Sequence, residues 1–161
     1  MSSVQGAFFS YKDFRQSLQQ QPNTARVWKG AELVDMRKRL EDSEVDIVAL
    51  AHDNSLEGCQ LIPGVAMSMQ WLKPGSVLEG HVHAWWHLFI IQCGSGTLTL
   101  GDAEPASISS GDLLLVPAWT RHGFVNTSET EPLAMLNVSN MPQMELLTNA
   151  CDSIGLINRQ A

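Results

Sequence analysis

The sequence predicts a single all-β domain of the sandwich or barrel class, and three observations lead to this prediction. From residue 60 onward, short apolar runs alternate with turn signals about every eight to twelve residues, a spacing typical of this class. The 161 residues are enough to bury a core without disulfide bonds, and 44% of them are hydrophobic, which excludes disorder by composition. No internal repeat or linker divides the chain, so one structural domain is expected.

Residues 1–60 are expected to form an N-terminal extension of short helices and strands that packs on a barrel formed by residues 61–161. Capping residues and apolar periodicity predict its elements. In chain order these are a helix over residues 11–20 capped by Ser10, a strand at 27–28, a helix over 32–40 and a strand over 45–50.

Barrel strands are expected where short apolar runs end at turns rich in Pro and Gly, such as Pro63-Gly64 and Gly94-Ser95-Gly96. A short C-terminal helix is expected over residues 142–150, with Met144 and Leu147 facing the barrel and Leu146 as a further candidate. The runs cover residues 61–62, 65–72, 88–92, 97–100, 113–116, 124–125 and 133–138.

Charge and cysteine content exclude several classes of partner and location. The formal net charge of −7 argues against nucleic acid or an anionic membrane surface as the main partner. No signal peptide and no apolar run long enough to span a membrane are visible. The three cysteines share no short spacing, so neither a disulfide framework nor a thiolate zinc site is expected. A reduced, cytoplasmic protein is the prediction.

Four of the five histidines fall in two short segments and are candidate metal ligands. His81 and His83 lie at the start of an expected strand, and alternate strand residues point to the same face, so both imidazoles should aim at one point. His87 follows shortly after, and His122 lies beyond the turn at Pro117. Neutral imidazoles that converge in a barrel suit a divalent transition metal.

The spacing around these histidines resembles the two motifs of the cupin superfamily. Gly75-x5-His81-x-His83-x3-His87-x6-Gly94 resembles the first motif, and Gly111-x5-Pro117-x-Trp119-x2-His122-x3-Asn126 resembles the second. The resemblance covers roughly residues 60–140. It implies a double-stranded β-helix, the cupin jelly-roll barrel, with a metal in its mouth held by His81, His83 and His122.

Two residues depart from the commonest cupin pattern. His87 stands where the family commonly has Glu, and Trp119 stands where it commonly has Gly. The segment 116–122 is most similar to cupins of the gentisate dioxygenase type, which also lack the Glu and use three histidines on iron. Those enzymes are larger and usually contain two cupin domains, so the resemblance does not carry over the substrate. His87 is expected either as a fourth ligand or as a hydrogen-bonding neighbour.

Aromatic and apolar side chains are expected to line a substrate pocket beside the metal. Four of the five tryptophans, Trp71, Trp85, Trp86 and Trp119, lie near the expected mouth, and strand alternation from the histidines turns three further apolar residues inward. Either Gln70 or Trp71 faces the pocket, because the register of their strand is open at this point. The candidate pocket residues are Gln70, Trp71, Trp85, Phe89, Ile91, Trp119 and Phe124, and no catalytic side chain is identified.

The number of histidine ligands separates two reaction classes. An all-histidine site is neutral, so a divalent ion keeps its charge and favours a small anionic chelating substrate. Three histidines on an octahedral ion leave room for a bidentate substrate and for dioxygen, as a dioxygenase needs. Four histidines leave only two positions, which favours a lyase, decarboxylase or isomerase that uses the ion as a Lewis acid.

The leading hypothesis is a mononuclear, dioxygenase-like metal enzyme that uses Fe(II) and acts on a small anionic or aromatic chelating substrate. The alternative is the non-oxidative lyase, decarboxylase or isomerase with Ni(II), Zn(II) or Mn(II), and a third hypothesis is a non-catalytic ligand-binding cupin. The resemblance also implies a homodimer, because single cupins usually pair through sheet edges and N-terminal segments.

Overall fold

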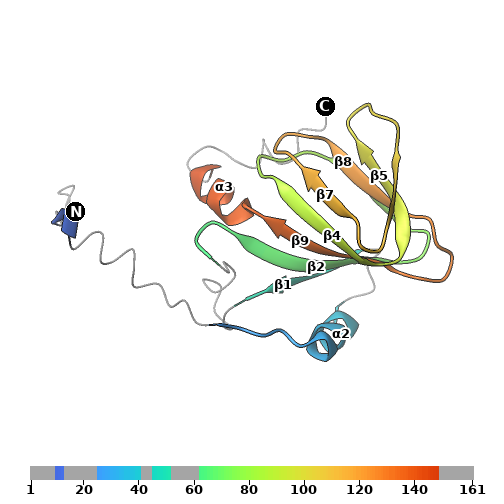
Figure 1. Ribbon diagram of the computed structural model, residues 1–161, viewed down its shortest axis with the longest axis horizontal. Coiled ribbons are helices and arrows are strands. Elements are labelled where there is room, and N and C mark those ends of the chain that lie inside the picture. The colour runs from blue at the N-terminus through green and yellow to red at the C-terminus, as the bar shows by residue number, and fades with distance from the viewer. Residues whose placement is uncertain (1–9, 13–24, 41–44, 52–61, 149–161) are drawn as a thin grey trace, which may run out of the picture.

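The computed structural model describes residues 10–12, 25–40, 45–51 and 62–148, which contain two antiparallel β-sheets and two short helices (Figure 1). In chain order the elements are α2 (Gly30–Lys38), β1 (Val45–Leu50), β2 (Ala66–Leu72), β3 (Val77–His81), β4 (His87–Cys93), β5 (Ser95–Leu100), β6 (Ala106–Ser109), β7 (Leu113–Val116), β8 (His122–Asn126), β9 (Leu133–Ser139) and α3 (Met141–Thr148). The all-β prediction is confirmed. No helix in these ranges is long and apolar enough to cross a membrane.

The two sheets are arranged as a jelly roll. One sheet has five strands in the order β1-β2-β9-β4-β7, and the other has four in the order β3-β8-β5-β6. Between β2 and β9 the chain crosses repeatedly from one sheet to the other, as the double-stranded β-helix requires. The pairing of β2 with β9 places residues 66, 68, 70 and 72 opposite 139, 137, 135 and 133. These positions form the inner face of the larger sheet, because Leu72 and Met135 both belong to the core between the sheets.

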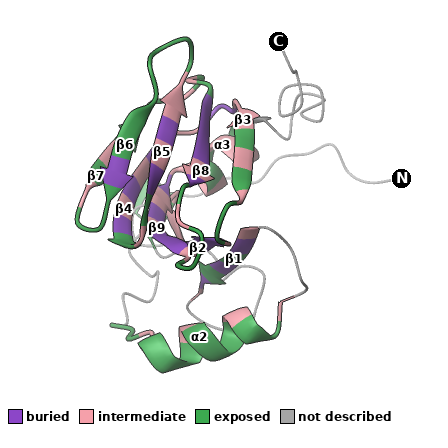
Figure 2. Cartoon of the chain, turned by 90° about the vertical axis from the view of Figure 1, so that its right-hand side faces the viewer, coloured by how far each residue is buried: buried purple, intermediate pink, exposed green. Residues whose placement is uncertain are grey.

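A hydrophobic core fills the space between the two sheets, and Figure 2 shows its buried residues along β4, β8 and β9. Strand alternation explains its composition, since every second residue of β4 and β8 points inward. Burial of each large side chain contributes roughly 1.5–3 kcal/mol. The buried members are Leu72, Phe89, Ile91, Leu98, Ile108, Val116, Phe124, Leu133 and Met135.

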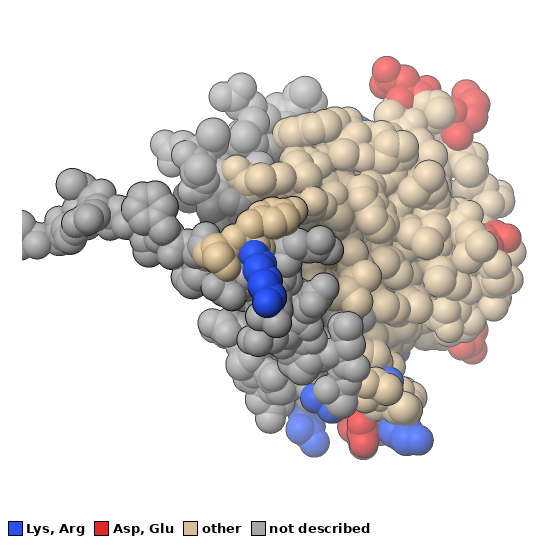
Figure 3. All heavy atoms as spheres, turned by 60° about the vertical axis from the view of Figure 1, so that its left-hand side comes forward, with Lys and Arg blue, Asp and Glu red and all other residues tan. Residues whose placement is uncertain are grey.

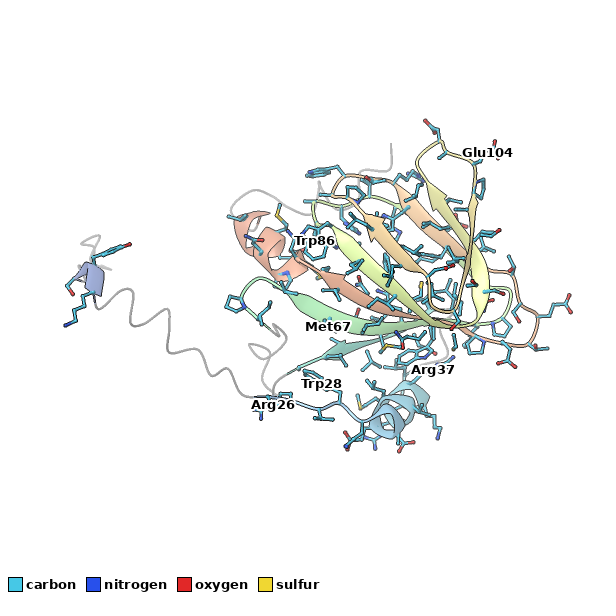
Figure 4. All side chains as sticks on the ribbon, viewed as in Figure 1. Arg26, Trp28, Arg37, Met67, Trp86 and Glu104 are labelled. Atoms are coloured by element: carbon cyan, nitrogen blue, oxygen red, sulfur yellow. The ribbon has the colours of Figure 1, made fainter. Side chains whose placement is uncertain are left out.

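A second, smaller core joins α2 to the outer face of the larger sheet. Leu33 and Leu40, on the inner side of the helical segment, pack against Val48 and Trp71. Arg37 also spans this interface: its Nε donates to Asp46 Oδ2 at 3.0 Å, and its guanidinium lies 5.4 Å from the centroid of the Trp71 ring. Figure 4 shows Arg37 between α2 and the sheet. The helix expected over residues 32–40 is therefore present as Gly30–Lys38, and Leu33 and Leu40 pack against the sheet whereas Met36 is 44% exposed.

The turn between β4 and β5 requires glycine. Gly94 has φ +83°, and a Cβ at this position would meet the carbonyl oxygen of Pro132. Any other residue would be destabilising at this position, because it would strain the left-handed backbone and would place a Cβ too close to this oxygen. The first cupin motif ends at this glycine, so the motif marks a turn that reverses the chain beside the β8–β9 connection.

Some sequence-based expectations differ from the structure. Residues 27–28 form no strand; Trp28 is anchored instead by a hydrogen bond from its Nε1 to the oxygen of Ala51 at 3.1 Å. Leu147 does not face the barrel, because it is 64% exposed on α3. The strand β6 was missed because its only large apolar residue is Ile108. Most of the helix expected over residues 11–20 lies outside the described residues.

Candidate metal centre

The four clustered histidines come from both sheets and from the loop between them. His81 is the last residue of β3, His122 is the first of β8, and His87 is the first of β4. His83 lies in the loop that joins β3 to β4. The expectation that His81 and His83 share one strand face is therefore wrong, because β3 ends at His81. The loop after β3 brings the His83 ring close to the His81 ring, with the two centroids 5.5 Å apart.

Sheet register places His81 and His122 side by side. These residues are direct partners across the β3–β8 pair, and their ring centroids lie 4.4 Å apart. His83 completes a group with them in which one ligand nitrogen from each ring lies within 4.8 Å of the others. His83 and His122 are buried and His81 is half-buried. Three imidazoles at this separation are a donor set for a divalent transition metal.

Hydrogen bonds to Nδ1 determine which nitrogen of each ring can bind a metal. Nδ1 of His81, His83 and His122 lies 2.9, 3.0 and 2.9 Å from the backbone oxygens of Glu79, Trp85 and Thr120. A carbonyl oxygen only accepts hydrogen bonds, so each Nδ1 carries the proton. Each Nε2 therefore keeps its lone pair free, which is the arrangement found around metal-binding histidines. The residues present fit a mononuclear metal ion.

His87 is held in the same tautomer by a side chain. Its Nδ1 lies 2.7 Å from Oδ1 of Asn137, which faces it from the neighbouring strand β9, and Nδ2 of Asn137 donates to Oγ of Ser68 at 3.4 Å. The Nε2 atoms of His87 and His83 are then 2.9 Å apart. Two metal–nitrogen bonds of about 2.1 Å at a right angle would separate the nitrogens by about 3.0 Å. The spacing therefore suits two ligands of one cation, and it is also short enough for a hydrogen bond between the two rings when one of them carries its proton on Nε2.

Burial keeps His83, His87 and His122 uncharged at neutral pH. Desolvation, together with the neighbouring imidazoles, lowers the pKa of His83 from 6.5 to about 3. Desolvation also lowers the pKa of His87 to about 4, against the opposing effect of its hydrogen bond to Asn137. The pKa of His122 is lowered for the same reason, burial. A metal binds the neutral form of imidazole. These rings are therefore already in the metal-binding form at pH 7, without a rise in pH.

Four of the seven candidate pocket residues lie on the inner side of the barrel. Phe89, Ile91 and Phe124 are almost fully buried in the main core, and the Phe89 ring lies 4.9 Å from that of His87. Gln70 is 8% exposed and occupies the inner face opposite Met135. The register of β2, which the sequence left open, therefore places Gln70 and not Trp71 on the inner face. Phe89 and Phe124 lie next to the imidazoles, and Ile91 and Gln70 continue the inner face of the sheet at the level of Met135.

Trp71 does not lie at the site. Because Gln70 faces inward, its neighbour Trp71 faces outward, where α2 covers it. Trp85 contacts the histidine cluster directly: its ring stacks on that of His83 with centroids 4.1 Å apart and planes 6° apart. Its carbonyl oxygen also accepts a hydrogen bond from Nδ1 of His83, so Trp85 restrains both the plane and the tautomer of this imidazole. The neighbouring Trp86 lies on the α3 side of the barrel (Figure 4), where its amide donates to Oδ1 of Asn140.

Trp119 lies beside the cluster in an unusual backbone conformation. Its φ is +62°, the only positive value at a non-glycine position among the residues described. A bulky residue there costs about 1–3 kcal/mol. The amide of Trp119 donates to the carbonyl of His83 at 2.8 Å, and this hydrogen bond joins the β7–β8 loop to the loop that contains His83. The side chain is 55% exposed.

Sequence reasoning missed the polar residues that support His87. Asn137, Ser68 and Ser139 lie on the inner faces of β9 and β2, and His87 pairs directly with Ser139 across β4 and β9. Asn137 and Ser139 are buried polar residues within otherwise apolar strands. A polar residue within an otherwise apolar strand is the one local signal that could have identified them, since a buried polar group in such a strand needs a hydrogen-bond partner.

Comparisons with known proteins agree with this geometry. Residues 68–139 match the family described as the cupin domain. A 1-hydroxy-2-naphthoate 1,2-dioxygenase of Nocardioides sp. (strain KP7) is 28% identical over 100 residues, which cover 62% of this chain and 26% of that protein. A gentisate 1,2-dioxygenase of Streptomyces sp. is 27% identical over 128 residues, which cover 75% of this chain and 36% of that protein.

Solved structures show the same fold. The salicylate 1,2-dioxygenase from Pseudaminobacter salicylatoxidans superposes with a TM-score of 0.60 at 17% identity, covering 87% of this chain and 36% of that chain. This chain therefore spans about a quarter to a third of the length of the relatives reported above.

Proposed function

We propose that this chain, a member of the cupin superfamily, is a mononuclear metal-dependent dioxygenase that acts on a small aromatic acid able to chelate the metal. One observation carries the proposal: three imidazoles, with one ligand nitrogen from each within 4.8 Å of the others, each bond a backbone carbonyl through Nδ1 and so leave the lone pair on Nε2 to bind a metal. The similarity to dioxygenases of hydroxynaphthoate and gentisate supports the substrate class.

His81, His83 and His122 are the proposed ligands, and Fe(II) is the favoured ion, with Ni(II), Zn(II) and Mn(II) as alternatives. The ion would supply a full positive charge for an anionic chelator and the redox chemistry that dioxygen requires. The backbone carbonyls that hold the three Nδ1 protons orient the rings before the ion binds. This preorganisation lowers the entropic cost of assembling the site.

The remaining inner residues bind and orient the substrate. Phe89, Ile91 and Phe124 exclude water from the inner side of the histidine cluster, which strengthens the attraction between an anion and the ion. Gln70 is the proposed polar contact for a hydroxyl or carboxylate of the substrate. No Lys or Arg within the described residues is buried, so the negative charge of the substrate would be matched by the ion.

Oxygen consumption tests the proposal. The protein is loaded with Fe(II) under anaerobic conditions, mixed with gentisate, salicylate or 1-hydroxy-2-naphthoate, and then exposed to oxygen. Oxygen uptake that needs both Fe(II) and an aromatic acid, and that is lost in His122→Ala, is the expected result. No uptake with any of these acids, nor with diketones or aliphatic hydroxy acids, would contradict it. Binding of an acid that stabilises the protein without turnover would instead favour a non-catalytic cupin.

A non-oxidative lyase, decarboxylase or isomerase is the second candidate, and the position of His87 favours it. The 2.9 Å separation between Nε2 of His87 and Nε2 of His83 is suitable for two ligands of one ion. A fourth imidazole would leave too few positions for both a chelating substrate and dioxygen. X-ray absorption of the metal-loaded protein, with and without salicylate, counts the nitrogen ligands: four that persist with the acid bound support this candidate.

We also propose that the protein is a homodimer that pairs through the outer face of β4, β7 and β9. The outward residues of these strands are apolar, and Leu113 and Leu115 are 67% and 66% exposed. Leu88 and Ile90 continue this apolar face on β4 and pair with Leu115 and Leu113. Figure 3 shows a broad uncharged surface on one side of the barrel, with acidic side chains at its margin. A second copy of the same face would cover these side chains by two-fold symmetry.

A further inference from the structure

The backbone of Trp119 is held in a conformation that favours glycine. Its φ of +62° belongs to the left-handed region, where the Cβ of a bulky residue clashes with its own backbone. Glycine would adopt this conformation without strain, and the resemblance noted above places glycine at this position in most cupins. The indole is therefore present at a cost to folding.

Burial of the indole does not offset that cost. The side chain of Trp119 is 55% exposed, whereas most core residues of this barrel are less than 5% exposed. An exposed aromatic ring on a strained backbone contributes little to the stability of the barrel. A strained, exposed residue of this kind is more easily explained by a ligand than by packing.

The position of Trp119 relative to the metal ligands suggests what that ligand is. Its amide donates to the carbonyl of His83 at 2.8 Å, and it lies three residues before His122. Its Cα is thus fixed beside two proposed ligands, at the rim of the site. Trp85 stacks on the ring of His83 at 4.1 Å, so the imidazole cluster already has one indole against it. Aromatic surface at this rim suits a planar ring more than an extended aliphatic chain.

We propose that Trp119 is a specificity-determining residue, whose indole contacts the aromatic ring of a chelating acid bound at the histidine cluster. This inference rests on the proposed metal site and names the part of the substrate that Trp119 selects. The metal would hold the carboxylate and hydroxyl of the ligand, and Trp119 would distinguish a ring from an aliphatic skeleton. The strained backbone keeps the indole at the rim.

Two chelators separate this role from a structural one. Salicylate and oxalate both chelate a divalent ion, but only salicylate carries a ring. Their dissociation constants are measured by calorimetry on the Zn(II)-loaded protein, which cannot turn over, for wild type, Trp119→Gly and Trp119→Phe. Trp119→Gly should weaken salicylate about 2- to 12-fold, the range expected for one aromatic contact, and leave oxalate unchanged. Trp119→Phe should keep most of the salicylate affinity.

Thermal unfolding of the metal-free variants gives a second readout. Trp119→Gly should melt no lower than wild type, because glycine relieves the strain at this φ. Trp28→Phe removes an indole near β1 and α2 (Figure 4), and it should leave the affinity for salicylate relative to oxalate unchanged.

Several results would overturn the inference: an equal loss for both chelators, no loss for either, a lower melting temperature of Trp119→Gly, or a changed oligomeric state of that variant. Failure of the Zn(II)-loaded wild type to bind salicylate would overturn it as well. The proposed function fails separately, if no acid supports oxygen uptake, because the calorimetric comparison does not depend on turnover.

Discussion

Each of the four clustered histidines uses Nδ1 for a hydrogen bond and leaves Nε2 for a ligand. Three of the acceptors are backbone carbonyls, so the backbone itself sets the tautomers of His81, His83 and His122. His87 differs, because its acceptor is the side chain of Asn137. The role of His87 can therefore be changed by a single substitution that leaves the other three imidazoles untouched.

Asn137→Ala should weaken metal binding about 10-fold or more if His87 is a ligand, because removal of a hydrogen-bond partner of a metal-bound imidazole has effects of this size. Asn137→Asp should restore the affinity, since a carboxylate also accepts from Nδ1. Competition with a coloured chelator measures the affinity of each variant for Zn(II).

Asn140→Ala is the matched control for that measurement. Oδ1 of Asn140 accepts a hydrogen bond from the amide of Trp86, so the variant loses an amide contact that involves no histidine. Wild-type affinity in Asn137→Ala would show that His87 is not a ligand.

The metal-free protein should lose stability as the pH falls from about 6.5 toward 4. The pKa values of His83 and His87 are lowered to about 3 and about 4, so in this window the unfolded chain binds protons that the folded protein does not. The contribution of these two histidines to the free energy of unfolding is therefore complete above pH 6.5 and decreases as the pH falls below it. Urea denaturation in the presence of a metal chelator measures this change.

His87→Asn provides the comparison, because it removes the lowered pKa of His87 itself and also one of the neighbouring imidazoles that lower the pKa of His83. The variant should show a shallower loss of stability between pH 6.5 and 4 than wild type. Identical slopes would contradict the lowered pKa of His87.

At the scale of elements, one asparagine connects three segments of the barrel. Asn126, at the end of β8, is 1% exposed. Its Nδ2 lies 3.1, 3.0 and 2.8 Å from the backbone oxygens of Leu72, Lys73 and Glu131, and its Oδ1 accepts from the amide of Ser128 at 3.0 Å. The end of β2 is thereby joined to the β8–β9 connection. The last residue of the second cupin motif is thus a structural one.

Asn126→Ala should lower the free energy of unfolding by about 2–4 kcal/mol, because it removes the hydrogen bonds that a buried amide makes to the backbone of Leu72, Lys73, Ser128 and Glu131. Thr127→Ala is the control, since Thr127 is exposed and adjacent. Denaturation in urea measures both. A loss below about 1 kcal/mol would show that water replaces the amide.

The helix α2 and the strand β1 belong to the predicted N-terminal extension. β1 pairs with β2 along its full length, and α2 covers the outer face of both strands through Leu33 and Leu40. We therefore propose that the described residues 25–40 and 45–51 of this extension are an integral part of the barrel. The division of the chain at residue 60 stays a prediction.

At the scale of the whole molecule, the outer face of β4 and β7 determines how the barrel can associate. Leu113→Lys combined with Leu115→Lys should convert the proposed dimer into a monomer, because two charges on each copy would be buried in the contact. Light scattering coupled to size-exclusion chromatography measures the mass. Val77→Lys, on the smaller sheet, should leave the dimer intact. A wild-type monomer would refute the proposal.

The cytoplasmic location stays a prediction.

Local pattern was sufficient for most of the fold. Period-two alternation identified the inward residues of β4 and β8, since Phe89, Ile91 and Phe124 are buried as expected. Helical spacing identified α2 through Leu33 and Leu40. The pattern failed at β6, where a four-residue strand contains a single large apolar residue, Ile108. A strand this short depends on its neighbour for stability, and that neighbour is not visible in a local window.

The sequence by itself determined the barrel class and the identity of the four imidazoles, because alternation, turn residues and histidine spacing are local properties of the chain. Tertiary structure alone decided which nitrogen of each ring is free, that Gln70 rather than Trp71 faces inward, and that Asn137 supports His87. It also showed that Trp119 is strained and exposed. These properties depend on strand register and on hydrogen bonds between residues 50 or more positions apart, such as His87 and Asn137, and no local pattern encodes contacts at such separations.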